Sequence, residues 1–213
     1  SGGELQRALS VGADPRKIAF AGVGKTDDEI RAGLEAGIGW FNVESAEELE
    51  NIARIAGQTG KQARIAVRVN PDVDPHTHAY TTTGKQETKF GIDLPRVAEL
   101  FERFAGNRDV RMEGIHLHLG SPVNTIDPYV ESIRRALGLI DSLRQSGHYI
   151  KAINIGGGFG AFYEGDEAPA AEDYARQLVP LLEGRELQVL LETGRSISAN
   201  AGVLLGRVLY CKS

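Results

Sequence analysis

The sequence is poor in cysteine, methionine and tryptophan, with one of each among 213 residues. The single cysteine, Cys211, excludes an internal disulfide framework and a metal site built from several thiolates. No apolar run approaches the roughly 20 residues of a membrane span, and no secretory leader pattern opens the sequence. These absences predict a cytoplasmic protein without a membrane partner.

Positive charge is also scarce. Lys and Arg number 24 against 29 Asp and Glu, which gives a formal net charge of −5. A nucleic-acid surface needs clustered Lys and Arg for its phosphate contacts, so nucleic acid is not predicted as a partner. What the chain does have is apolar content: 41% hydrophobic residues over this length can bury a substantial core.

Short apolar segments alternate with amphipathic ones along the chain. The segments expected as strands cover residues 18–21, 40–43, 63–69, 110–119, 150–155 and 187–191. The segments expected as helices cover residues 26–36, 45–56, 95–105, 128–145 and 171–182. Thr26 with Glu29, and Ser45 with Glu48, match the signature of a capping box at two of the helix starts.

This alternation predicts a parallel sheet flanked by helices, either doubly wound or closed as a barrel. A closed (β/α)8 barrel needs eight strands and about 250 residues, whereas this chain has six expected strands and a helix under way at its start. We therefore expect an α/β fold of the TIM-barrel type that lacks its first two strands. The polar stretch from Asn70 to Lys89 is too long for an ordinary connection and is expected to be functional.

Two of the apolar runs, Ile153–Gly160 and Leu190–Ser196, lead into glycine. Such runs are typical of buried parallel strands that open into anion-binding loops. Gly156, Gly157 and Gly158 have no side chains to obstruct their backbone N–H groups. Two such loops on successive strands predict a phosphorylated cofactor at one rim of the barrel.

Two glycine motifs for nucleotides are only partly matched. Gly22–Thr26 is similar to the end of a P-loop, but Ala19 stands where the first glycine is required, so a turn and a helix cap are favoured. Gly156–Ala161 satisfies the loose dinucleotide pattern. However, Phe162–Asp166 continues as loop instead of helix, and the motif comes late in the chain. A dehydrogenase is therefore the weaker alternative.

His116 and His118 share one face of a predicted strand, because side chains alternate along a strand. The opposite face is apolar and should meet the helices, so the histidines should point into the barrel. His118 is nearer the carboxyl end and better placed for a ligand, and Ser121 follows it in the loop. Taken alone, a pair of hydrogen-bonded core histidines is an equally good interpretation, but the glycine loops at the same rim favour function. A zinc site is disfavoured, because no third ligand has a characteristic spacing.

Glu192 and Arg195 are the most informative charges. A carboxylate at the end of a barrel strand needs a partner. A pyridinium nitrogen would be one, because a carboxylate keeps that nitrogen protonated and makes the ring an electron sink. Arg195 suits a phosphate or a substrate carboxylate, which its planar fork binds bidentately. The alternative is an ion pair between the two side chains at the surface.

In these segments the chain resembles the pyridoxal-phosphate-dependent decarboxylases with an alanine racemase-like barrel, and the diaminopimelate decarboxylase family in particular. The blocks that carry the resemblance run in family order over essentially the whole chain. They are Ser1–Leu5, Gly22–Thr26 with Phe41–Ser45, Arg68–Asp74 continuing to Thr77, His78 and Lys89–Ile92, His116–Ser121, and the two glycine segments. The block from Asn70 to Ile92 discriminates most, because related ornithine and arginine decarboxylases differ there.

The resemblance implies a role for each matching position. His118 stacks on the ring of pyridoxal 5′-phosphate, and Glu192 pairs with its pyridinium nitrogen; these two are the implied catalytic residues. Arg195 is also implied to meet the substrate. The residues implied to bind the cofactor, most of them at its phosphate, are His118, Ser121, Gly156, Gly157, Gly158, Glu192, Gly194 and Arg195. No metal is implied.

The implied reaction is the decarboxylation of meso-2,6-diaminopimelate to L-lysine, in lysine biosynthesis, by a homodimer. Residues 1–202 would be a partial pyridoxal-phosphate-binding barrel, and residues 203–213 would start the strand that leads into a C-terminal β-domain. The family's Schiff-base lysine lies on the first barrel strand, upstream of these residues, and the C-terminal domain with its cysteine-containing loop follows them. The chain alone is therefore expected to be inactive, or nearly so.

The chain departs from the family pattern at two positions. Thr193 replaces the usual proline between Glu192 and Gly194, and Pro122 stands where the family usually has glutamine. Two alternatives stay open. Another basic amino-acid decarboxylase, such as carboxynorspermidine decarboxylase, uses the same barrel, and the chain is also compatible with a non-catalytic module that binds pyridoxal phosphate.

Overall fold

The computed structural model of the chain describes residues 1–73, 90–162 and 168–212. Its strands are β1 (Ala19–Phe20), β2 (Trp40–Val43), β3 (Ala63–Asn70), β4 (Ile92–Asp93), β5 (Val110–His116), β6 (Ala152–Asn154) and β7 (Gln188–Leu190). Its helices are α1 (Gly2–Ser10), α2 (Asp27–Ala36), α3 (Ala46–Thr59), α4 (Leu94–Phe104), α5 (Asp127–Gln145), α6 (Ala171–Leu182) and α7 (Arg195–Ser198), with a 3-10 helix, η1, at Pro15–Lys17.

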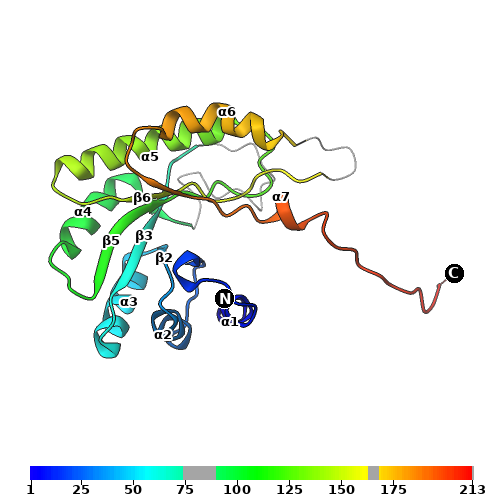
Figure 1. Ribbon diagram of the computed structural model, residues 1–213, viewed down its shortest axis with the longest axis horizontal. Coiled ribbons are helices and arrows are strands. Elements are labelled where there is room, and N and C mark those ends of the chain that lie inside the picture. Colours follow the sequence, from blue (N-terminus) through cyan, green and yellow to red (C-terminus); the bar gives the residue numbers. More distant parts are fainter. Residues whose placement is uncertain (74–89, 163–167, 213) are drawn as a thin grey trace.

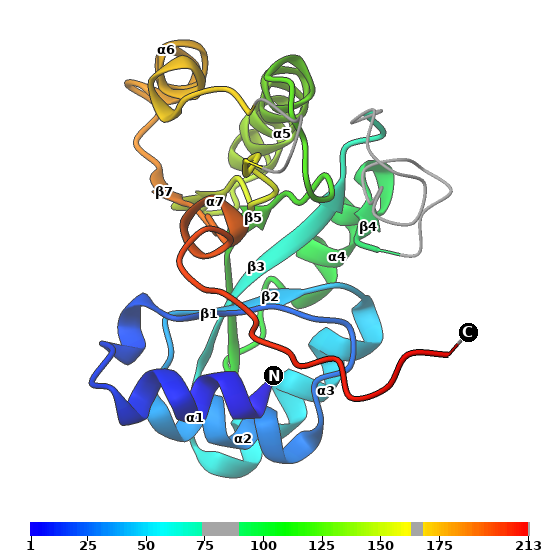
Figure 2. The same ribbon diagram turned by 90° about the vertical axis from the view of Figure 1, so that its right-hand side faces the viewer.

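All strand pairs are parallel, and the sheet path runs β1-β2-β3-β5-β6-β7. The helices follow the outer side of this curved sheet, from α1, α2 and α3 beside β1 and β2 to α5 and α6 beside β6 and β7 (Figure 1; Figure 2). The path ends at β1 and at β7 without closing. The described residues therefore form an open half-barrel, which confirms the predicted α/β fold and its six main strands.

The strand β4 was not predicted. It pairs only with β3, matching Ile92 to Val69 and Asp93 to Asn70. Asn70, which opens the polar stretch predicted to be functional, therefore lies beside Asp93, which follows the stretch in sequence. Residues 74–89 of that stretch lie outside the described residues. Among the helices that the structure describes, none has both the length and the apolar composition that crossing a bilayer requires.

Each central strand has one apolar and one polar face. The apolar side chains point outward into a continuous core with the helices and are at most 1% exposed, among them Phe41, Val43, Ile65, Val67, Ile115 and Ile153. Burying each such side chain contributes about 1.5–3 kcal/mol. The alternate side chains point into the half-barrel, and they include most of the buried polar residues: Asn42, Glu44, Arg68, Asn70, His116 and Asn154. The inward face predicted for the histidines is thus confirmed at His116.

Helix starts follow the capping chemistry of the sequence. Thr26 Oγ1 accepts a hydrogen bond from the Glu29 N–H, and the Glu29 carboxylate accepts one from the Thr26 N–H, so the first predicted capping box is confirmed. At α3, Ser45 Oγ accepts from the Glu48 N–H at 3.1 Å, but the second half of the box is absent. The Glu48 carboxylate instead accepts from the Glu44 N–H and from Lys25.

Lys25 explains why that carboxylate is diverted. Its side chain is 1% exposed, and Nζ donates to Gly22 O at 2.7 Å, to Asn42 O at 2.8 Å and to Glu48 Oε1 at 2.5 Å. An ammonium has three N–H donors, and all three are used here. Gly22–Thr26 is therefore a turn into α2, as predicted, with its lysine bound to the protein itself.

The prediction that residues 203–213 start the strand leading into a C-terminal β-domain stays a prediction, because no part of that domain belongs to the chain. Residues 203–212 have no strand partner and are exposed, with Leu204 99% exposed. Cys211 is exposed as well. An extended segment becomes a strand only when another strand pairs with its backbone, and β7, the strand that precedes it, pairs only with β6.

Candidate functional site

The predicted site residues converge where β5, β6 and β7 end. Because these strands are parallel, the loops that follow them emerge at one rim. The Gly157 N–H donates to His118 Nδ1 at 3.4 Å, and the Glu192 N–H donates to Gly156 O at 2.8 Å. Arg195 Nη2 donates to Ser121 Oγ at 2.6 Å. Residues that are up to 74 positions apart thus form one connected cluster.

The glycine loop is held by close backbone contacts. A Cβ atom on Gly156 would lie 2.2 Å from Leu117 O, one on Gly157 would lie 2.0 Å from Glu192 O, and one on Gly158 would lie 2.0 Å from Gly120 O. Gly156 and Gly158 also have φ values of 70° and 87°, which favour glycine. Every side chain is therefore excluded at these three positions by neighbouring backbone.

The amides of this loop are less available than the sequence predicted. The Gly156 N–H donates to Asn154 Oδ1 at 2.9 Å, and the Gly157 N–H donates to His118. Only the Gly158 N–H has no hydrogen bond to another described residue. Tyr129 Oη supports the loop from α5 by donating to Gly157 O at 3.0 Å. The expectation of three unobstructed amides was wrong, because two of them anchor the loop to its neighbours.

Glu192 is fixed by two amide side chains. Asn42 Nδ2, on β2, and Asn154 Nδ2, on β6, donate to the same atom, Glu192 Oε1, at 2.8 Å and 2.7 Å. His116 Nε2 lies 3.6 Å from that oxygen. No ion pair joins Glu192 to Arg195, both of which the structure describes. The alternative of a surface ion pair between them is therefore wrong.

The two histidines differ in their environments. His116 is 1% exposed, and neither ring nitrogen has a hydrogen bond, so the interpretation of two hydrogen-bonded core histidines is wrong for this residue. Burial, followed by the charge of Arg68, lowers the pKa of His116. The same two causes lower the pKa of His118 to about 4. Both imidazoles are thus neutral at neutral pH.

Acidification is therefore expected to destabilise the fold. An unfolded histidine has a pKa of about 6.5 and the folded His118 has one of about 4, so between these values the unfolded chain binds more protons. The contribution of His118 to the free energy of unfolding is complete above pH 6.5. It falls as the pH drops toward 4, by up to about 3 kcal/mol. Urea unfolding at pH 7.5 and pH 4.5 measures the difference. His118→Asn should reduce it, and an unchanged difference would contradict the assignment.

The sequence did not single out the polar partners of the site. Asn42 and Asn154 hold Glu192, and Arg68 pairs with Glu44 at 2.6 Å while its Nη2 donates to His118 O at 3.4 Å. The alternation of apolar and polar residues along each strand contained the signal that identifies them. These side chains occupy inward positions on strands whose outward neighbours are apolar, so a polar residue there points to the interior of the barrel.

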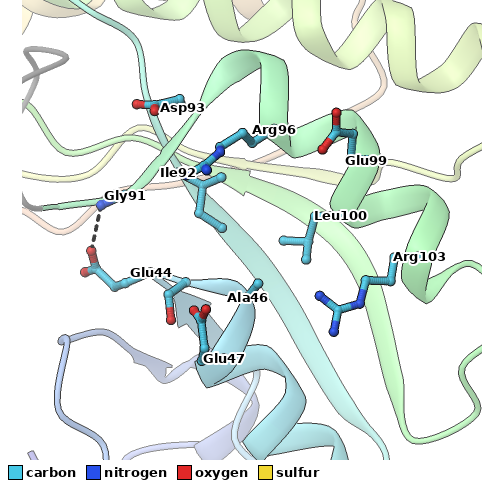
Figure 3. Close-up of a pocket in the computed structure, with 11 residues that line it drawn as sticks. Glu44, Ala46, Glu47, Gly91, Ile92, Asp93, Arg96, Glu99, Leu100 and Arg103 are labelled. Carbon is cyan, nitrogen blue, oxygen red and sulfur yellow. Dashed lines mark hydrogen bonds between the residues drawn. The ribbon is translucent and has the colours of Figure 1, made fainter.

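A separate pocket of about 360 Å³ lies between the start of α3 and α4. In Figure 3, Glu44 and Glu47 line it from one side, and Asp93, Arg96 and Glu99 line it from the other. None of the predicted site residues lines this pocket. The carboxylate of Glu44, one of its lining residues, accepts from the Gly91 N–H at 3.1 Å and from Arg68.

A family model described as pyridoxal-dependent decarboxylase, pyridoxal binding domain, matches residues 1–199. The chain belongs to the pyridoxal-dependent decarboxylases. The cofactor is thereby pyridoxal phosphate, as the sequence predicted. The residues available to hold the cofactor are those of the converging loops. The described residues contain no group of three or more His, Cys, Asp and Glu side chains arranged for a metal ion.

Several curated relatives of this domain are diaminopimelate decarboxylases. The chain is 45% identical to a diaminopimelate decarboxylase of Pseudomonas aeruginosa over 212 residues and 45% identical to one of Aquifex aeolicus over 213 residues. It spans about half of each relative, 51%, and all of its own length is covered. The crystal structure of diaminopimelate decarboxylase from Helicobacter pylori complexed with L-lysine superposes with a TM-score of 0.88 at 37% identity, over 92% of this chain and 50% of that one.

The site of this decarboxylase domain fits pyridoxal phosphate by its donor set. The Gly158 N–H, the Ser121 hydroxyl and the Arg195 guanidinium are donors of the kind that bind a phosphate. Next to them, Glu192 Oε2 receives no hydrogen bond from the described residues and is an acceptor for a protonated ring nitrogen. The neutral imidazole of His118 presents an uncharged face to an aromatic ring.

Proposed function

We propose that the chain is the barrel part of a diaminopimelate decarboxylase, which releases CO₂ from meso-2,6-diaminopimelate and forms L-lysine. The observation that carries the proposal is the pairing at one rim of a fixed carboxylate, Glu192, with an anion-binding cluster of Ser121 and Arg195. The identity of 45% to diaminopimelate decarboxylases over the whole chain supports the choice of substrate.

Each predicted residue has a proposed task. Ser121 Oγ, the Gly156–Gly158 loop with its remaining N–H, and Gly194 and Arg195 bind the phosphate. His118 stacks on the ring and, being neutral, adds no positive charge against a protonated ring nitrogen. Glu192 Oε2 holds a proton at that nitrogen. When bound, pyridoxal phosphate supplies the electron sink for the electron pair left by CO₂.

The side chains also restrict what happens at the site. Leu117 and Leu119 are at most 2% exposed and flank His118 in the segment that follows β5. Arg195 is on the exposed rim, where it can meet a substrate carboxylate while still bonded to Ser121. A planar guanidinium has five N–H donors, so both tasks are compatible.

We propose that these 213 residues alone are inactive. The resemblance places the covalent lysine on a strand outside the chain, and Lys25, the lysine closest to a strand end, has no free donor. The general acid of the family likewise belongs to the C-terminal domain, across a homodimer interface. We also propose that the complete protein is a cytosolic homodimer, as the resemblance implies.

The test is a decarboxylation assay of the complete polypeptide that carries this chain. With pyridoxal phosphate added, meso-2,6-diaminopimelate should yield CO₂ and L-lysine in equal amounts, and the 213-residue chain should yield neither. Carboxynorspermidine, ornithine and arginine complete the substrate panel. Faster turnover of one of these would replace the proposed substrate, and cofactor binding without any turnover would identify a non-catalytic module.

A further inference from the structure

We infer that Asn42 and Asn154 are positioning residues that aim one oxygen of Glu192 at the cofactor ring. The inference rests on the proposed function, because it concerns the contact between Glu192 and the ring nitrogen. The two amides come from β2 and β6, and they are 150 and 38 residues from Glu192 in sequence. Only the folded half-barrel brings the three side chains together.

The geometry divides the carboxylate into two unlike oxygens. Oε1 accepts two amide hydrogen bonds, at 2.8 Å and 2.7 Å, and an oxygen of a carboxylate has two lone pairs. His116 Nε2, at 3.6 Å, is too far for a third bond to this atom. Oε2 has no hydrogen bond to a described residue. A further donor, such as a protonated ring nitrogen, therefore meets Oε2.

The orientation of both amides is determined by their contacts. Asn154 Oδ1 accepts from the Gly156 N–H at 2.9 Å, so its Nδ2 must face Glu192. Asn42 can face a carboxylate only with its NH₂ group, because its carbonyl is also an acceptor. Both asparagines are at most 1% exposed, so their side chains are held in place by the surrounding protein. The Glu192 N–H bound to Gly156 O fixes the backbone as well.

Asn42 offers a nearly isolated test of this role. Its Oδ1 has no hydrogen-bond partner, so its only side-chain hydrogen bond is the one to Glu192. Asn42→Leu removes that donor with little change of volume and adds no charge. Asn42→Ala removes the same donor with a smaller side chain and likewise adds no charge next to Glu192. The matched control is Ser132→Ala, because Ser132 is 1% exposed and its Oγ has no partner.

The experiment uses the complete polypeptide loaded with pyridoxal phosphate. Asn42→Leu should lower kcat about five- to tenfold, which an ordinary hydrogen bond accounts for, while KM stays within about twofold because substrate contacts are intact. The pH at which the visible absorbance of the bound cofactor changes should shift downward, because a misaligned carboxylate holds the ring proton less well. Ser132→Ala should change neither quantity.

A double-mutant cycle separates positioning from mere structure. In a Glu192→Gln background, Asn42→Leu should produce no further spectral shift, since the group being positioned has changed. If Asn42→Leu fails to fold, Asn42→Ala decides by the same split between kcat and KM. The inference is overturned if the absorbance of the Asn42→Leu variant changes at the same pH as that of the wild type. It is also overturned if Asn42→Leu shifts this pH equally in the wild-type and the Glu192→Gln backgrounds. Failure of the proposed function gives a different result, because the wild type itself then does not turn over diaminopimelate. The spectral comparison of the variants still decides the role of the asparagines in that case.

Discussion

Gly157→Ala is expected to destabilise the chain by more than about 4 kcal/mol, a size reserved for severe disruptions. The new Cβ would lie 2.0 Å from Glu192 O, whereas carbon and carbonyl oxygen approach to about 3.3 Å at the closest. The obstacle is backbone on both sides, so no side-chain rotation relieves it. Either the glycine loop or the segment after β7 must move by about 1 Å, and Glu192 moves with it.

Urea unfolding of the chain measures this effect, and a glycine elsewhere supplies the control. Gly138 lies in the middle of α5, is exposed, and a Cβ added to it would meet nothing within 4 Å. Gly138→Ala should therefore stabilise the chain by up to about 1 kcal/mol, as expected for a helix interior. A Gly157→Ala variant within about 1 kcal/mol of the parent would contradict the close contact between the two loops.

Glu192→Gln in the complete polypeptide should lower kcat by about 100- to 1000-fold, the range seen when one preorganised electrostatic contact is removed. The substitution is isosteric, and the amide oxygen can still accept from Asn42 and Asn154. An NH₂ group then faces the ring nitrogen and cannot hold a proton on it. Affinity for pyridoxal phosphate should change by no more than a few-fold, because the phosphate is bound by other residues.

The measurements are the kcat of decarboxylation and the cofactor dissociation constant from fluorescence titration. Glu99→Gln is the control, since Glu99 is exposed on α4 and removal of its charge touches no residue of the site. Loss of cofactor affinity in parallel with kcat would place Glu192 at the phosphate instead of at the ring. Full activity of the variant would remove the residue from the mechanism.

Much of the fold followed from local patterns in the sequence. Apolar runs such as Trp40–Val43, the cap at Thr26 and the glycine-rich turn after Asn154 are read from neighbouring residues, and each was found where it was expected. The strand predicted to start at residues 203–213 stays a prediction, because strand formation depends on a partner as well as on composition. The short β4 was missed for the complementary reason: two residues have no period to detect.

The site was only partly predictable. Glu192 was singled out as a carboxylate at the end of a barrel strand. Its actual partners, Asn42 and Asn154, lie 150 and 38 residues away, and nothing local connects them. The glycine loop was recognised, whereas the use of its amides by Asn154 and His118 depends on how three strand ends pack. Sequence patterns identified the chemical groups, and tertiary packing determined which of them remain free to bind.

The central claim is that this half-barrel binds pyridoxal phosphate with Glu192 at the ring nitrogen and the glycine loop at the phosphate. A crystal structure of the complete polypeptide with the cofactor bound tests it most directly. Glu192 Oε2 should lie within hydrogen-bond distance of the ring nitrogen, with Oε1 still bound to Asn42 and Asn154, and the phosphate should contact the Gly158 N–H, Ser121 and Arg195. A cofactor bound with its ring nitrogen away from Glu192, or outside these loops, would contradict the account.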